Sequence, residues 1–251
     1  MAELREIRVF DDAAALALAA AGEAVRVLSD AARNHGRATI ALSGGSTPRA
    51  LYRLLAEDPF RDRMPWSAIH FFWGDERHVP PDHSESNDRM AREAMLDLVP
   101  VPAKNIHRIR AEEKDAGRAA EEYEAELRSS FALSAGGWPR FDLALLGLGP
   151  EGHTASLFPG SPAIFEDERL VVAPWVEAHH AFRITMTPAV FNHAAEVLFL
   201  VSGEEKAPAV AAVLEGERDP RLYPAQVVRP VDGKLLWMLD RAAARDLVSA
   251  V

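Results

Sequence analysis

The chain has 251 residues, of which 48% are hydrophobic, and its formal net charge is −10 at pH 7. This length and apolar content are sufficient for one large α/β domain with a sizeable core. The acidic balance argues against nucleic acid or an anionic membrane surface as a partner, because both attract a basic face. The sequence contains no cysteine, which excludes disulfides, thiol nucleophiles and cysteine-ligated zinc.

The N-terminal residues 1–6 carry mixed charge and have no apolar core, so we expect no secretory signal. The longest apolar run near them, residues 13–21, is about half the length that a bilayer requires. Together with the lack of cysteine, these features are compatible with a reducing compartment. We therefore expect a cytoplasmic protein.

Short apolar runs alternate along the chain with segments of helical periodicity. The first helix follows the capping residues Asp11 and Asp12 and runs to about Asn34. This alternation predicts a mostly parallel sheet covered on both faces, in a single domain over residues 1–251. Strands are expected near Ile7 and at 38–42, 69–73, 141–148, 170–174, 182–186, 197–201 and 235–239, and further helices at 48–56, 87–98, 111–130, 188–193 and 204–214.

A glycine-rich turn follows the strand expected at 38–42. It contains Ser43, Gly44, Gly45, Ser46 and Thr47, and Pro48 stands where the first residue of the next helix is expected. Two glycines allow a ligand to approach the backbone closely, and the helix adds its positive end. The turn is thus a candidate phosphate cradle, although it lacks the GK[ST] ending of a Walker loop. An ordinary connection between a strand and a helix remains the alternative.

Charged residues follow the strand expected at 69–73. Arg77 could bind a phosphate with two hydrogen bonds or face a developing oxyanion, and Asp75 could orient a base or a sugar hydroxyl. Both would lie at the carboxyl edge of the sheet, where open α/β folds bind ligands. A solvated loop is the alternative interpretation.

The segment GPEGHTAS at residues 149–156 follows the apolar run 141–148 and contains His153. Histidine is the side chain best suited to moving a proton near neutral pH. A histidine flanked by glycines at the carboxyl end of a strand is therefore a candidate general base. A capping or core histidine would be the structural alternative.

Two further cations are candidates for holding an anion. Arg183 lies on an expected strand, where a buried cation needs a partner, and Lys206 lies in the first turn of an expected helix, where a cation is mildly unfavourable. A carboxylate partner for Arg183 and a solvated surface position for Lys206 are the alternatives. The remaining histidines show no ligand spacing, so we expect no metal, and no G-x-S-x-G elbow of a serine hydrolase is present.

Taken together, these segments resemble the 6-phosphogluconolactonase family. The match extends over about residues 40–214 in family order, and the stretch 224–240 also fits. Each motif has limited specificity alone, whereas the ordered set is highly specific. The matching motifs are ALSGGSTP at 41–48, FFWGDERHV at 71–79, HSESN at 83–87, LGLGPEGHTASLFP at 146–159, RITMT at 183–187 and VSGEEK at 201–206.

The resemblance implies a modified Rossmann-like three-layer fold, as in glucosamine-6-phosphate deaminases. It implies hydrolysis of 6-phosphoglucono-δ-lactone to 6-phosphogluconate in the oxidative pentose phosphate pathway, with no cofactor and a small-molecule substrate as partner. His153 would be the catalytic base, with Asp75, Arg77 and Asn87 on the lactone side. The loop of Ser43, Gly44, Gly45, Ser46 and Thr47 would hold the substrate together with Gly152, Arg183 and Lys206.

One residue departs from the family pattern. Glu151 stands where the family usually has aspartate, and the additional methylene could alter how the loop of His153 is held. The carboxylate is retained, so the departure affects the role of Glu151 and not the expected reaction.

Two other functions are open at this stage. Deaminase-isomerases of the same fold place a glutamate five residues after the loop histidine, where this chain has Phe158. A sugar-phosphate sensor would keep the phosphate loop without needing His153, and it would usually carry a DNA-binding module, for which the strand near Ile7 leaves no room. For the lactonase interpretation we expect a monomer or a weak homo-oligomer.

Overall fold

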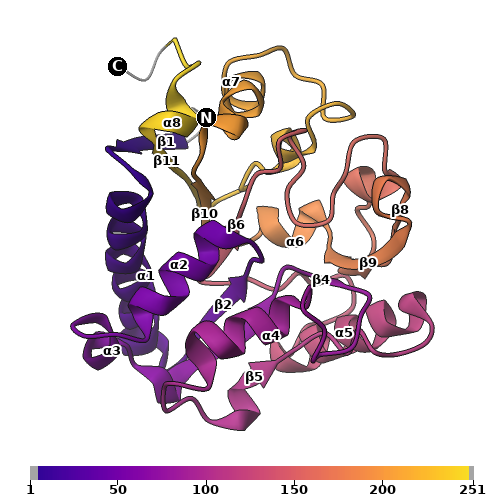
Figure 1. Ribbon diagram of the computed structural model, residues 1–251. Helices are drawn as coiled ribbons and strands as arrows, with labels where there is room; N and C mark the ends of the chain where they lie inside the picture. Colours follow the sequence, from indigo (N-terminus) through magenta and orange to yellow (C-terminus); the bar gives the residue numbers. More distant parts are fainter. Residues whose placement is uncertain (1–4, 249–251) are drawn as a thin grey trace.

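The computed structural model describes residues 5–248, and its elements form two sheets with helices packed around them (Figure 1). Residues 1–6, on which the expectation of no leader rests, lie partly outside the described range. Within that range no helix combines the length and apolar composition needed to cross a membrane. The helices are α1 (Ala13–His35), α2 (Ser46–Leu55), α3 (Phe60–Arg63), α4 (Asn87–Ala91), α5 (Ala116–Ser130), α6 (Pro188–Asn192), α7 (Ala207–Leu214) and α8 (Arg241–Ala244).

The larger sheet is parallel throughout and has seven strands in the order β1-β11-β10-β6-β2-β3-β5. Its inner strands are buried on both faces, as the apolar runs predict. Phe199 and Trp237 stack across the β10–β11 pair at 3.9 Å between ring centroids. The strands are β1 (Arg5–Phe10), β2 (Ala38–Leu42), β3 (Ile69–Trp73), β5 (Ile106–His107), β6 (Leu143–Leu146), β10 (Glu196–Val201) and β11 (Lys234–Asp240).

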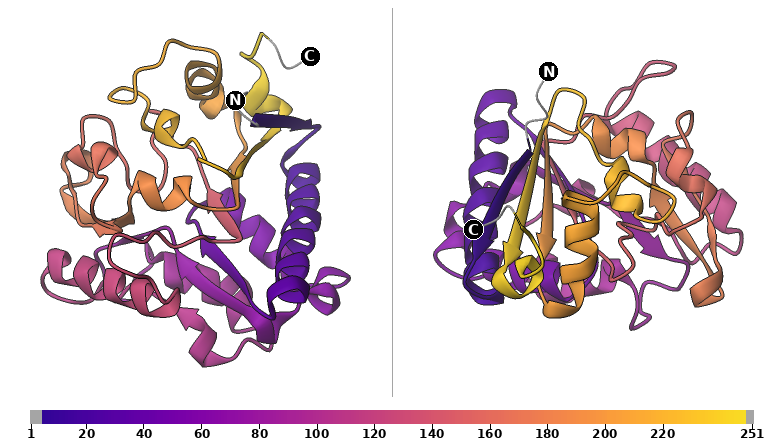
Figure 2. Two further views of the ribbon diagram at one scale, coloured as in Figure 1. Left: turned by 180° about the vertical axis from the view of Figure 1, so that it is seen from behind. Right: turned by 90° about the horizontal axis from the view of Figure 1, so that it is seen from above.

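Layers of other elements cover both faces of this sheet. Helices α1 and α2 lie together on one face, and the segments that carry α6 and α7 lie on the other (Figure 2). Helix α1 begins at the predicted cap, because the Asp12 carboxylate accepts the Ala15 amide at 2.8 Å, and it ends at Gly36, which has φ +71°. The expected three-layer α/β fold is therefore confirmed.

The order of the strands places a switch point between β2 and β6. From β2 the chain continues outward through β3 to β5, whereas from β6 it continues the opposite way through β10 to β11. The loops that leave the carboxyl ends of β2 and β6 consequently diverge and leave a crevice between them. The glycine-rich turn follows β2, and the loop of His153 follows β6.

A second sheet differs from the sequence-based expectation. The strand expected at 182–186 is β9 (Ala181–Met186), and it pairs antiparallel with β4 (Asp75–Arg77), β7 (Val171–Val172) and β8 (Trp175–Val176) outside the parallel sheet. Residues 75–77, for which no strand is predicted from the sequence, form β4 because they gain backbone partners on β9. Local apolar patterns do not reveal which strand a segment will pair with.

Several helix boundaries also differ from the predicted ones. Helix α2 starts at Ser46, so Pro48 is its third residue and not its first. The helix expected at 87–98 changes after Ala91 into a π-helical turn at Arg92–Leu96. The helix expected from residue 111 starts at Ala116, because the Asp115 carboxylate caps it by accepting the amides of Gly117 and Arg118.

Two buried tyrosines hold the backbone at the carboxyl ends of β2 and β3. The hydroxyl of Tyr52 on α2 accepts the Ser43 amide at 2.9 Å and donates to the Ser43 carbonyl at 2.8 Å. The hydroxyl of Tyr123 on α5 bonds the amide and carbonyl of Trp73 in the same way, at 2.8 and 3.0 Å. Each tyrosine therefore pairs backbone groups that the strand leaves unpaired where it ends.

The Tyr52→Phe exchange tests this anchoring. It leaves the buried Ser43 amide and carbonyl without the partner they have here, and the free energy of unfolding should fall by about 1–3 kcal/mol. Urea denaturation measures the change. Tyr223→Phe is the matched control, because no hydrogen bond of the Tyr223 hydroxyl is found within residues 5–248. Equal stability of the two variants would contradict the anchoring role.

Candidate active site

A cavity of about 260 Å³ lies at the switch point of the parallel sheet. It brings together eight of the predicted site residues, which come from segments far apart in the sequence: Ser43, Gly44, Gly45, Asp75, Arg77, Asn87, His153 and Lys206. Both the glycine-rich turn and the imidazole therefore line one space. The remaining wall consists of Gly147, Leu148, Gly149, Pro150, Thr154 and Ala155.

Four predicted residues do not line this cavity. Ser46 and Thr47 lie in the first turn of α2, with Ser46 exposed. Gly152 is buried against Tyr223, and a Cβ at position 152 would lie 2.8 Å from the Tyr223 ring. Arg183 lies on β9 directly opposite Arg77 on β4. These residues can support the cavity or border it, but they are not part of its wall.

The glycine-rich turn is shaped by its contact with Asn87. A Cβ added at Gly44 would lie 2.0 Å from the Asn87 Oδ1 atom, so only glycine permits this packing. Gly45 has φ +107° and precedes the first residue of α2, a conformation that favours glycine. The positive end of α2 and the backbone of Gly44 and Gly45 therefore adjoin the cavity, as an anion site requires.

Asp75 is buried and connects three segments of the site. Its Oδ2 atom accepts the Ser156 hydroxyl at 2.6 Å, and its backbone carbonyl accepts the Asn87 side-chain amide at 3.0 Å. Asp75 thus joins β4 to the loop of His153 and to the start of α4. The Asp75 side chain is therefore placed both to line the cavity and to orient a neighbouring group.

Glu76 was not assigned a role from the sequence, although it stands between two predicted site residues. Side chains alternate along a strand, so Asp75 and Arg77 face the cavity while Glu76 points away from it. Its carboxylate accepts the amides of Arg77, Asn87 and Asp88 at 2.7–2.8 Å and the Ser86 hydroxyl at 3.0 Å. Glu76 therefore connects the loop before α4 to β4. The alternation of side chains along a strand is the sequence signal from which this role could have been predicted.

Arg77 and Arg183 form a pair of neighbouring cations. The Arg77 guanidinium donates to the Glu85 carbonyl at 2.7 Å, and that of Arg183 donates to the Phe182 carbonyl at 3.4 Å. Burial lowers the pKa of Arg183, and the nearby Arg77 lowers it further. Neither guanidinium forms an ion pair with a carboxylate in the described part of the chain, so both can attract an anion.

The loop of His153 is a tight turn with little freedom. The Gly149 amide donates to the His153 carbonyl at 2.8 Å, and the Gly152 amide donates to the Gly149 carbonyl at 2.9 Å. A Cβ at Gly149 would lie 2.0 Å from the His153 Nδ1 atom, so the imidazole packs directly on backbone. The Thr154 hydroxyl donates to the Gly147 carbonyl at 2.8 Å and closes the turn.

Burial dominates the electrostatics of His153. It lowers the pKa of the imidazole below its ordinary value, against the opposing effect of the Glu151 and Asp75 carboxylates. The Glu151 Oε1 atom lies 3.1 Å from Nδ1, although that nitrogen has no hydrogen-bond partner in the geometry of residues 5–248. The lowered pKa favours the neutral imidazole, which is the form that a proton acceptor needs.

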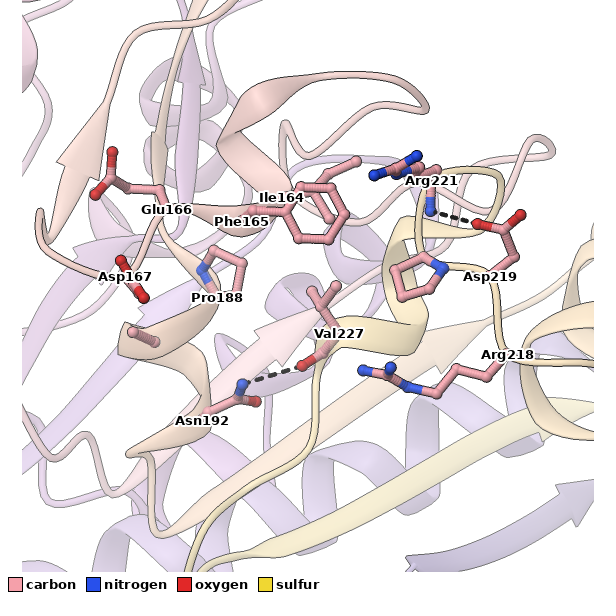
Figure 3. A pocket seen from close by; sticks show the side chains of 12 residues that line it. Ile164, Phe165, Glu166, Asp167, Pro188, Asn192, Arg218, Asp219, Arg221 and Val227 are labelled. Atoms are coloured by element: carbon pink, nitrogen blue, oxygen red, sulfur yellow. Dashed lines mark hydrogen bonds between the residues drawn. The ribbon is translucent and has the colours of Figure 1, made fainter.

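A larger cavity, of about 580 Å³, lies elsewhere and contains none of the predicted site residues (Figure 3). Phe165 and Arg221 lie at its rim, and Asn192 donates to the Val227 carbonyl at 3.0 Å along its wall. It lacks a histidine and a glycine-rich turn. Among the described residues, no cluster of three or more potential ligands could hold a metal ion.

Comparison with known proteins agrees with this architecture. The family model described as glucosamine-6-phosphate isomerases/6-phosphogluconolactonase matches residues 11–237. The chain belongs to this family. It is 45% identical to the 6-phosphogluconolactonase of Synechocystis sp. over 220 residues, which cover 88% of this chain and 89% of the relative.

Solved structures show the same fold. The 6-phosphogluconolactonase of Trypanosoma brucei superposes with a TM-score of 0.87 at 31% identity, over 98% of this chain and 100% of that one. A monomeric glucosamine-6-phosphate deaminase superposes with a TM-score of 0.79 at 19% identity, over 96% of this chain and 100% of that one. The second likeness concerns the fold alone.

The pH dependence of stability tests the buried state of Glu76. Burial raises the pKa of this carboxyl from 4.5 to about 7, because loss of solvent outweighs its hydrogen bonds. A carboxyl whose pKa is raised on folding stabilises the protein below its unfolded pKa, and this contribution is lost as the pH rises. The stability advantage of the native protein over Glu76→Gln should therefore shrink between about pH 4.5 and 7.

The measurement is the free energy of unfolding in urea at pH 5 and pH 8 for both proteins. Glu121→Gln, at an exposed position on α5, corrects for the general effect of removing one acidic charge. A stability advantage of the native protein over Glu76→Gln that grows with pH would contradict the prediction. It would mean that the four hydrogen-bond donors to the Glu76 carboxylate outweigh burial and lower its pKa.

Proposed function

We propose that the chain hydrolyses 6-phospho-D-glucono-1,5-lactone to 6-phospho-D-gluconate, the reaction of the oxidative pentose phosphate pathway. The observation that carries this proposal is the shared cavity, in which the His153 imidazole and a glycine-rich helix start face the same space. The names of the relatives agree with it. A phosphorylated lactone presents both an electrophilic carbonyl and an anion, which these two features suit.

In the proposed reaction His153 acts as general base. It accepts a proton from a water molecule as the water oxygen attacks C1 of the lactone and forms a tetrahedral oxyanion. When the bond between C1 and the ring oxygen breaks, His153 returns the proton to that oxygen, so that the imidazole ends neutral. General acid–base catalysis of this kind contributes about 10²–10⁴ in rate.

The other cavity residues hold the substrate and stabilise charge. Arg77 or loop amides would stabilise the oxyanion, with Asp75 and Asn87 beside them. The turn of Gly44 and Gly45 and the Lys206 ammonium would bind the phosphate, and Arg183 would add positive charge from its position beside Arg77 on the neighbouring strand. Fixing the phosphate remotely from C1 positions the carbonyl for attack and lowers the entropic barrier.

The deaminase reaction of related proteins is less well supported. Position 158, where those enzymes place a glutamate, holds Phe158, whose ring lies against His153. A phenyl ring cannot transfer a proton during ring opening. We propose no cofactor, a cytoplasmic location and a monomer or weak homo-oligomer; the acidic charge and the lack of cysteine are compatible with that location.

The His153→Ala exchange tests the proposed base. It should lower kcat for the phosphorylated lactone by about 10²–10⁴ while the fold remains intact, because the attacking water then loses its proton acceptor. Consumption of the lactone and circular dichroism measure the two effects. His35→Ala, at the exposed end of α1, is the matched control. Turnover within about twofold of the native rate would remove His153 from the role.

The Lys206→Ala exchange tests phosphate recognition. Loss of an ammonium that faces the phosphate should raise KM for the phosphorylated lactone by about tenfold or more, a cost typical of a charged hydrogen bond. KM for unphosphorylated gluconolactone should change little. Steady-state kinetics with both lactones provide the comparison, and equal effects on the two would mean that Lys206 does not read the phosphate.

A further inference from the structure

The His153 imidazole is stacked on an aromatic ring that the proposed chemistry does not use. The ring centroids of His153 and Phe158 lie 4.2 Å apart, with 26° between the planes. Phe158 is 9% exposed, although it is only five residues from a cavity-lining side chain. A second histidine, His179, meets the Phe158 ring edge-on at 5.4 Å. Phe158 therefore stands between His153 and the segment after β8.

The backbone between the two residues is shaped to make this stack. The Leu157 amide donates to the Thr154 carbonyl at 2.9 Å, and these two residues form an isolated antiparallel bridge. Ala155 has φ +46°, a left-handed conformation that a non-glycine residue rarely adopts. The chain thus reverses direction after His153 and brings residue 158 back over the imidazole.

The carboxylate beside Nδ1 is that of Glu151, whose Oε1 atom lies 3.1 Å from this nitrogen. The nitrogen is buried and the two atoms lack the alignment of a hydrogen bond, and the Glu151 carboxylate is 44% exposed. A catalytic histidine commonly has its second nitrogen held by a carboxylate or carbonyl, which fixes the ring. Here the backbone of Gly149 and the ring of Phe158 also contact the imidazole. Packing therefore restrains the ring in addition to the half-exposed Glu151 carboxylate.

We propose that Phe158 is the positioning residue of the catalytic base: its ring fixes the plane of the His153 imidazole and shields one face of it from water. This inference rests on the proposed function, in which His153 accepts the proton. Aromatic stacking at this distance contributes beyond simple burial. Phe158 itself touches neither the attacking water nor the lactone, because it does not line the cavity.

The stack has a consequence for titration. Burial lowers the pKa of His153, while the Glu151 and Asp75 carboxylates raise it and the Lys206 ammonium lowers it. Removing the ring of Phe158 would admit water to one face of the imidazole without changing these three charges. The pKa of His153 should then rise toward its ordinary value of 6.5.

The test compares Phe158→Leu, which removes the flat ring, with Phe158→Tyr, which keeps it. Phe158→Leu should lower kcat by about 10²-fold, the cost of a misplaced catalytic group, with KM within about twofold of native. The acid limb of its pH–rate profile should move to higher pH. Phe158→Tyr should retain the native kcat and the native pH profile. Phe165→Leu, whose ring is exposed at the larger cavity (Figure 3), is the matched control.

Proton NMR gives a readout independent of turnover. The carbon-bound imidazole protons of His153, assigned by their loss in His153→Ala, should resonate upfield in the native protein because they lie over the Phe158 ring. The upfield shift should disappear in Phe158→Leu, and the titration midpoint should rise. If Phe158→Leu does not fold, Phe158→Met, which fills the space with a flexible chain, replaces it.

Three results would overturn the proposal. The first is a spectrum of the native protein without the upfield shift. The second is a Phe158→Leu protein with unchanged kcat and pH profile. The third is an effect of Phe158→Leu on KM alone, which would make Phe158 a substrate contact. Failure of the native protein to hydrolyse the lactone would instead refute the proposed function. The NMR shift distinguishes the two cases, because it reports the stack whatever the substrate.

Discussion

The reversal of strand order between β2 and β6 is the constraint on which the site depends. Chain connections leave these adjacent parallel strands in opposite directions, so the loops after them diverge. The crevice between them receives the glycine-rich turn from one side and the His153 loop from the other. Every other contribution, from β4, α4 and the segment before α7, is a side chain brought to the edge of that crevice.

Buried polar side chains hold these loops where regular secondary structure ends. Tyr52 pairs the backbone after β2, Glu76 collects three amides and a hydroxyl, and Asp75 accepts the Ser156 hydroxyl. Unpaired buried polar groups are costly, so each such contact narrows the conformations open to a loop. The imidazole of His153 differs from these groups, because the ring of Phe158 stacks on it and the Glu151 carboxylate beside Nδ1 is half exposed. Burial lowers the pKa of this imidazole, which agrees with an apolar support.

Much of the site could be predicted from local sequence because its chemistry is carried by short motifs at strand ends. The glycine pair at 44–45, the histidine at 153 and the cations at 77 and 206 all line the cavity. The parts that could not be predicted depend on pairing across long sequence distances. The β4–β9 pairing joins residues 75–77 to 183–185, and it places Arg183 beside Arg77 and not in the cavity wall. Apolar periodicity shows that a strand exists but not which partner it takes.

The sequence by itself determined the α/β class, the alternation of strands and helices, and the residue types available for proton transfer and anion binding. These follow from composition, side-chain periodicity and the backbone freedom of glycine, which are local properties. Only the tertiary structure decided which of these residues share a cavity, that Glu76 turns away from it and that Phe158 returns over His153. Strand order and the pairing of β4 with β9 are set only when distant segments pack together. The left-handed backbone at Ala155 is not indicated by its residue type, because alanine rarely adopts that conformation.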